Sequence, residues 1–160
     1  MKYKIIHTIC IQQIKKVKEN CGDVSVIVIA DHGQIDMKSH IYLNQTHDYT
    51  KYFYATPTID TRMLSFFVKE DFKEEFEKNF LQDFGNDCIL IKKEEFEKMN
   101  ILGWSKVSTN TKNVLGEYVA VVLSDKFILS DKISLEDSIS TKGNHSGITK
   151  EETTIPLIIL

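Results

Sequence analysis

The sequence has no excess of charge of one sign and no long apolar run. Its 160 residues carry a formal net charge of −3, with acidic and basic side chains interleaved, so neither a nucleic-acid-binding face nor a polybasic membrane patch is predicted. No stretch approaches the roughly 18 apolar residues of a membrane helix, and the N-terminus lacks the small-residue cleavage pattern of a signal peptide. We therefore expect a cytoplasmic protein that binds neither nucleic acid nor membrane.

Cysteine is also scarce. Cys10, Cys21 and Cys88 are odd in number, widely spaced and set among apolar residues, which argues against a disulfide framework and against a zinc knuckle. We expect reduced thiols in the core. The 42% hydrophobic and 27% charged residues are typical of one soluble globular domain that buries a substantial core.

One apolar stretch, residues 24–30, stops at the polar tripeptide Asp31-His32-Gly33. The stretch predicts a strand buried on both faces, typical of the parallel sheets of α/β proteins, whose ligands bind beyond the carboxyl ends of the strands. Gly33 permits a bend that turns Asp31 and His32 toward one metal ion. The alternative is a strand-end turn in which Asp31 caps the backbone and His32 is a solvated loop residue.

Hydrophobic periodicity predicts the other elements. A helix is expected over residues 6–21, another over 93–99, and a third that Asp71 opens through a capping box with Glu74. The third helix carries a seam of core aromatic side chains at Phe72, Phe76, Phe80 and Phe84. Strands are predicted at 38–43, 52–57, 63–68, 88–91, 117–123, 127–129 and 155–160, with a turn at 58–61.

The order of these elements predicts an α/β fold with an insertion. Between about Tyr52 and Asp131 the pattern is strand-strand-helix-strand-helix-strand, typical of a small α+β subdomain set into a larger sheet. We divide the chain into a core segment 1–51, an inserted α+β subdomain 52–131, and a core segment 132–160 that carries His145 and the final strand.

Two polar clusters together resemble the pattern of a known family. The chain carries Asp31-His32-Gly33 after an apolar run, then Asn144-His145-Ser146-Gly147, and then Glu151-Glu152 before Ile155-Pro156-Leu157-Ile158. This is similar to the C-terminal part of the alkaline phosphatase superfamily, in its type I phosphodiesterase and nucleotide pyrophosphatase branch. The resemblance implies an alkaline-phosphatase-like α/β/α sheet in which residues 52–131 are the variable insertion.

The resemblance also implies a set of metal ligands. In that superfamily a threonine or serine nucleophile lies between two divalent ions. Asp31 and His32 would bind the ion that activates the nucleophile, and His145 would bind the second ion, which holds the phosphoryl oxygen. Zinc is the expected metal, with manganese or magnesium as alternatives, and the substrate would be a phosphoester or nucleotide-type small molecule.

The sequence departs from the family pattern before the tripeptide. The nucleophile, a further aspartate and an Asp-x-x-x-His motif are absent from the thirty residues that precede Asp31. Asp36 and His40 have that spacing but follow the tripeptide, which we interpret as coincidence, and His7, His40 and His47 are expected to be exposed or in loops. We therefore expect a C-terminal portion of a metal-dependent phosphoric ester hydrolase, inactive alone, whose exposed apolar surface promotes self-association.

Two other functions stay open at this point. One is a free-standing module that binds a ligand or partner without catalysis. The other is a mononuclear metal enzyme in which Asp31, His32 and His145 form a set of two histidines and one carboxylate.

Overall fold

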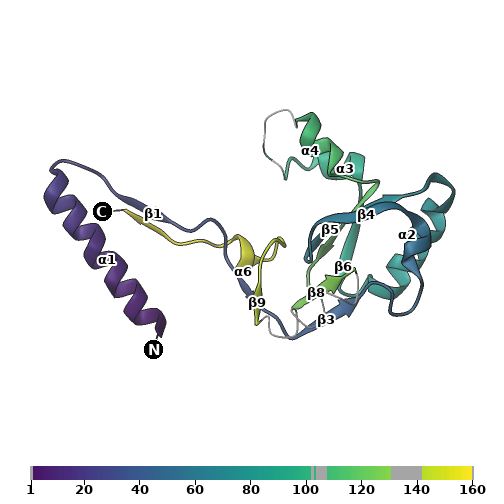
Figure 1. The fold of residues 1–160 in the computed structure, drawn as a ribbon, viewed down its shortest axis with the longest axis horizontal. Coiled ribbons are helices and arrows are strands. Elements are labelled where there is room, and N and C mark those ends of the chain that lie inside the picture. Colours follow the sequence, from purple (N-terminus) through teal and green to yellow (C-terminus); the bar gives the residue numbers. More distant parts are fainter. Residues whose placement is uncertain (1, 102, 104–107, 131–141, 160) are drawn as a thin grey trace. The chain divides into compact units, whose positions relative to one another are not determined.

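The computed structural model describes residues 2–101, 103, 108–130 and 142–159, with side chains from residue 11 onward (Figure 1). The chain divides into two compact units, one formed by Met1–His32 with Thr154–Leu160 and the other by Gly33–Thr153. Each unit is described by itself. The predicted division into segments 1–51, 52–131 and 132–160 stays a prediction.

A four-stranded antiparallel sheet forms the centre of the Gly33–Thr153 unit. Its strand order is β4-β5-β7-β6. All residues of β7 are buried, because a central strand has a neighbour on each side and packed layers on both faces. The strands are β4 (Phe53–Asp60), β5 (Met63–Val68), β6 (Cys88–Lys92) and β7 (Tyr118–Val122).

The four strands predicted for this sheet are confirmed, with one difference. β4 continues to Asp60 and pairs with β5 as far as Met63. The turn therefore lies at Thr61 and Arg62, and the predicted turn at 58–61 is wrong. The physical reason is that Thr58, Ile59 and Asp60 all pair with β5, although Ile59 has a left-handed φ of +78°.

Helices pack on both faces of this sheet (Figure 1). The helix α2 (Lys73–Phe84) buries Phe76, Phe80 and Phe84 against one face, which confirms three residues of the predicted aromatic seam. The fourth, Phe72, precedes the helix and is partly buried. The helix α3 (Lys93–Lys98) buries Phe96 against the other face, beside Val119 and Val121. The two helix layers explain why the central strand β7 is buried on both faces.

The predicted start of α2 is wrong. A short 3-10 helix, η2 (Glu70–Phe72), precedes α2. The N-cap of α2 is Phe72, which makes no side-chain capping hydrogen bond. Asp71 and Glu74 therefore do not form a capping box. The hydrophobic packing of Phe72 against the core decides where the helix begins.

Shorter elements complete this unit. The strand β3 (Ser39–Tyr42) pairs in parallel with β8 (Lys126–Leu129), as the predicted strands at 38–43 and 127–129 require. The strand β2 (Ile35–Asp36) pairs with β9 (Gly143–Asn144), so the chain just after the Asp-His-Gly tripeptide lies beside the chain just before His145. The remaining elements are η1 (Tyr49–Tyr52), α4 (Thr109–Asn113) and α6 (Lys150–Thr153).

The other unit contains the helix α1 (Lys2–Cys21) and a two-stranded ribbon. The ribbon pairs β1 (Ile27–Ile29) with β10 (Leu157–Ile159) in antiparallel register. The helix is predicted correctly. Strands therefore form within the predicted stretches 24–30 and 155–160, but their pairing is antiparallel and the predicted burial is wrong. Four apolar side chains on one face of the ribbon are 60–66% exposed, namely Ile27, Ile29, Leu157 and Ile159.

Two further observations bear on the composition. Cys88 is buried as predicted, whereas Cys21 is exposed at the end of α1, so the prediction of a core thiol is wrong there; the side chain of Cys10 lies outside the described ones. Within the part of the chain that the structure describes, no helix combines the length and the apolar character that a membrane span needs.

Candidate metal centre

Asp31 and His32 follow β1 directly, and their side chains turn toward each other. The Asp31 Oδ1 atom accepts the backbone N–H of His32 at 3.0 Å, and the Asp31 Oδ2 and His32 Nε2 atoms are 3.6 Å apart. Two ligands of a tetrahedral zinc ion, each about 2.0–2.1 Å from the metal, stand about 3.3 Å apart. The two side chains, 88% and 42% exposed, therefore fit one divalent ion.

His145 lies in a loop of the other unit, immediately after β9. Its backbone N–H donates to Asn144 Oδ1 at 2.8 Å, and the Asn144 Nδ2 atom donates to Thr61 Oγ1 at 2.9 Å. Thr61 belongs to the turn between β4 and β5. The chain immediately before the half-buried His145 is therefore held by a residue 83 positions from Asn144.

Ser146 has an unusual backbone conformation for a residue with a side chain. Its φ is +82°, in the left-handed region, where a non-glycine residue is maintained only if the surroundings over-determine it. Its Oγ atom is buried and has no hydrogen-bond partner among the described residues. Strain of this kind clusters at ligand-binding positions, which agrees with the adjacent His145 as a candidate ligand.

A buried ion pair supports this loop. The guanidinium of Arg62, fully buried in the β4–β5 turn, faces the carboxylate of Glu152 with two hydrogen bonds, one of them Nη2 to Oε2 at 2.9 Å. The remaining Arg62 donors reach the backbone oxygens of Ser124, Lys126 and Val122. This paired, fully hydrogen-bonded arrangement makes burial of the charge tolerable.

Glu152 connects the ion pair to the His145 loop. Its carboxylate accepts the backbone N–H groups of Gly147 at 2.9 Å and Thr149 at 3.1 Å, together with the Thr149 hydroxyl at 2.7 Å. Burial alone raises the pKa of this carboxyl, but the hydrogen bonds from Arg62, Thr149 and Gly147 outweigh it and lower the pKa to about 2. Glu152 is therefore ionised throughout the physiological range.

Sequence reasoning did not assign a role to Arg62 or Glu152. Glu152 was noticed only as part of the resemblance, and Arg62 was not singled out. One signal was available, since Arg62 is the single arginine in the sequence. Its partner lies 90 residues away, and no local pattern connects positions so far apart.

The structure brings together part of the predicted ligand set. Asp31 and His32 are adjacent in one unit and His145 belongs to the other, so the predicted proximity of Asp31 and His145 stays a prediction. Within the described residues, no group of three or more His, Cys, Asp or Glu side chains is arranged to hold a metal ion.

The remaining histidines differ partly from expectation. His40 is half-buried within β3, so its prediction as an exposed or loop residue is wrong. His47 lies in a loop, as expected, but its Nδ1 atom is 2.7 Å from Asp83 Oδ2, which also accepts the Tyr49 hydroxyl at 2.9 Å. The side chain of His7 lies outside the described ones.

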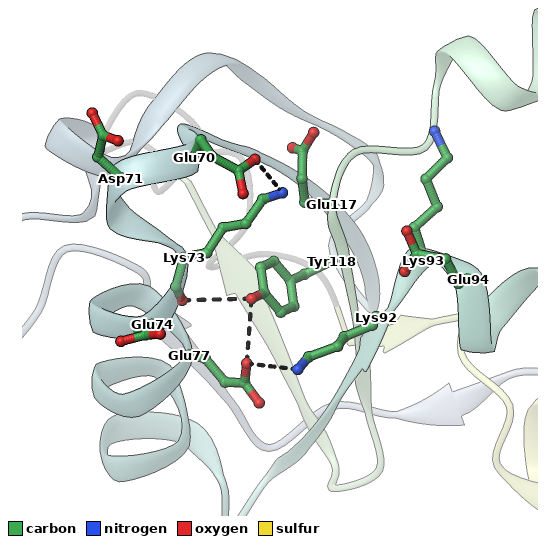
Figure 2. A pocket seen from close by; sticks show the side chains of 10 residues that line it. All are labelled: Glu70, Asp71, Lys73, Glu74, Glu77, Lys92, Lys93, Glu94, Glu117 and Tyr118. Atoms are coloured by element: carbon green, nitrogen blue, oxygen red, sulfur yellow. Dashed lines mark hydrogen bonds and ion pairs between the residues drawn. The ribbon is translucent and has the colours of Figure 1, made fainter.

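A cavity of about 570 Å³ lies between α2 and the strands β6 and β7 (Figure 2). Its lining contains six carboxylates and three lysines. Lys73 pairs with Glu70 at 2.7 Å, and Lys92 pairs with Glu77 at 3.3 Å. Burial and the neighbouring Glu77 raise the pKa of the Tyr118 hydroxyl to about 12. Two of the six carboxylates are thus paired with lysines, and the lining as a whole carries more negative than positive charge.

Comparison with known proteins gives a fold but no sequence family. No family model matches the chain, and no curated protein sequence matches it. The structure is similar to solved structures of murine ectonucleotide pyrophosphatase/phosphodiesterase 5, with a TM-score of 0.61 and 21% identity over 90% of this chain. A second structure of that protein, an inactive variant in complex with AMP, gives a TM-score of 0.58 and 21% identity.

The predicted fold class is confirmed by this similarity. The chain has a mixed α/β fold with a central sheet, similar to the alkaline-phosphatase-like fold of the nucleotide pyrophosphatase/phosphodiesterase proteins. The matched region is 36% of the murine chain, so this chain spans about a third of the protein that it resembles.

Proposed function

We propose that this chain is the C-terminal portion of a metal-dependent phosphoric ester hydrolase of the nucleotide pyrophosphatase/phosphodiesterase type. The observation that carries the proposal is the fold similarity over 90% of the chain. The spacing of Asp31-His32-Gly33 and the His145 loop, which resembles the metal-binding motifs of that superfamily, supports it independently.

In this proposal the chain supplies three metal ligands. Asp31 and His32 present a carboxylate oxygen and an imidazole nitrogen 3.6 Å apart to one ion, and His145 presents its imidazole to a second. Paired divalent ions, zinc above all, stabilise the attacking and leaving oxygens of an in-line displacement when bound. A catalytic zinc ion normally has three protein ligands. Here one ion would have two, Asp31 and His32, and the other would have only His145, so the chain would bind both ions weakly.

We propose a nucleotide-type phosphoester as the substrate class. The support is the AMP bound to the murine protein that shares this fold. The Gly33–Thr153 unit, which contains the inserted sheet, would be the part of the chain that faces the substrate.

We further propose a cytoplasmic location, which rests on the free thiols of Cys21 and Cys88. Alkylation of Cys21 in intact cells, before any reducing agent is added, would show the reduced state that the proposal requires. A protein isolated with Cys21 already oxidised would contradict it.

The test of the function is a zinc titration of the chain, followed by NMR of the imidazole signals and accompanied by an assay with an aryl ester of a nucleoside monophosphate. We expect chelator-reversible shifts of His32 and His145 at weak, roughly millimolar affinity, and hydrolysis no faster than the metal-only background. His7, His40 and His47 are internal controls and should not respond.

Two outcomes would contradict the proposal in different ways. Binding near one micromolar, with turnover abolished by His145→Ala, would favour the self-contained mononuclear metal enzyme. No zinc response at His32 or His145 would favour the binding module without catalysis.

A further inference from the structure

Arg62 and Glu152 form a buried pair whose position calls for an explanation. Arg62 is fully buried and Glu152 is 4% exposed. A buried ion pair contributes little net stability compared with well-packed apolar side chains, because both charges lose their hydration. What distinguishes this pair is the set of groups that it holds in place.

The contacts of the pair converge on the loop that carries His145. Arg62 holds the Glu152 carboxylate, which in turn holds the backbone N–H groups of Gly147 and Thr149. A side chain at Gly147 would collide with this carboxylate. The loop is thus anchored on its C-terminal side by direct hydrogen bonds to one buried acid.

The same turn anchors the other side of the loop. Thr61, next to Arg62, accepts a hydrogen bond from Asn144 at 2.9 Å, and Asn144 accepts the backbone N–H of His145. The backbone oxygen of Glu152 also accepts the Gly33 N–H at 2.8 Å. Two neighbouring residues of the β4–β5 turn therefore brace both ends of residues 144–149.

We propose that the β4–β5 turn, through Arg62 and Thr61, positions His145 for metal binding. This inference rests on the proposed function, because it takes His145 as a ligand. It assigns the turn between β4 and β5 a role in organising the loop that carries His145. Partners hydrogen-bonded to a metal ligand typically change metal affinity by 10–100-fold when they are removed. The turn and Glu152 hold the loop that carries His145, so we expect an effect at the lower end of this range.

The experiment compares site-resolved zinc affinities, from NMR titration, at His145 and His32. Glu152→Gln keeps the shape of the side chain but removes its charge, and Arg62→Lys keeps the charge but removes the fork of donors. We expect each to weaken zinc binding at His145 about tenfold and to leave binding at His32 unchanged. Glu151→Gln, an exposed neighbour, is the matched control and should leave both unchanged.

A variant that unfolds would lose the zinc responses of His145 and His32 together. For that case Thr61→Val provides a second test. It removes the acceptor of the Asn144 bond and leaves the ion pair intact. A selective loss of affinity at His145 supports the inference. The inference is overturned if zinc affinity at His145 is unchanged in Thr61→Val and in every folded variant of the Arg62–Glu152 pair. The proposed function itself is overturned if His145 shows no zinc response in the unsubstituted chain.

Discussion

The strand β7 and the ribbon of β1 with β10 are built from similar apolar sequences but have opposite environments. All five residues of β7 are buried, between β5 and β6 and between two helix layers. The ribbon has two strands, and Ile29 and Ile159 on one of its faces are 60% and 66% exposed. An apolar run therefore predicts a strand, whereas burial depends on the layers that pack over it.

The candidate ligands are divided between these two environments, because His145 lies in the Gly33–Thr153 unit whereas Asp31 and His32 follow the exposed ribbon. The Gly33–Thr153 unit contains the buried core around Phe66, Phe76 and Val119, together with the Arg62–Glu152 pair. The other unit carries Asp31 and His32 on a ribbon with an exposed apolar face. The following predictions, from the largest expected effect to the smallest, test this contrast.

Phe76→Ala should destabilise the core unit by about 3–5 kcal/mol. The ring of Phe76 is fully buried, with ring centroids of Phe66 and Tyr118 each 5.3 Å away, and its removal leaves a cavity. Chemical denaturation measures the change. Leu81→Ala, on the exposed side of the same helix, is the control, with an expected change within about 0.5 kcal/mol; equal effects would contradict the assigned core.

Acidification should remove about 3 kcal/mol of stability through Glu152. The pKa of Glu152 is about 2 in the folded protein against an ordinary value of 4.5, so the folded state binds fewer protons than the unfolded state between these values. Its contribution is fully present above pH 4.5 and is lost as the pH falls toward 2. Denaturation at a series of pH values measures the free energy of unfolding. It should show this loss in the control variant Glu151→Gln and a smaller loss in Glu152→Gln.

Replacing Ile29 and Ile159 by serine should reduce self-association and change the free energy of unfolding by no more than about 0.5 kcal/mol per site. Both side chains are already largely in water, so little burial is lost. Light scattering over a range of concentrations measures the association. Ile101→Ser, an exposed position outside the ribbon, should leave association unchanged, and a monomeric unsubstituted chain at all concentrations would refute the prediction.

Cys21 and Cys88 should differ in the rate at which their thiols react. Cys21 is exposed, whereas burial, reinforced by Asp87, raises the pKa of the Cys88 thiol to about 12. At pH 8 an aromatic disulfide reagent should modify Cys21 rapidly and Cys88 only after denaturation. Cys21→Ser and Cys88→Ser assign the phases, and a fast phase that disappears in Cys88→Ser would show that β6 opens readily.

Local pattern was sufficient for most elements of the core unit. The aromatic spacing of α2 and the apolar runs of β5 and β7 each match one periodicity, so helix and strand could be predicted from neighbouring residues. The start of α2 and the end of β4 could not, because packing of Phe72 and pairing with β5 override the local signals.

The sequence by itself predicted the α/β class and the aromatic core of α2, because these depend on residue type and periodicity. The three candidate ligands, Asp31, His32 and His145, came from the resemblance of their motifs to a known family and stay a prediction. Only the tertiary structure decided that β1 and β10 form an exposed antiparallel ribbon and that Arg62 meets Glu152 across 90 residues. Pairing partners and buried charge pairs are long-range contacts, and their free energy is set by which surfaces the completed fold brings together.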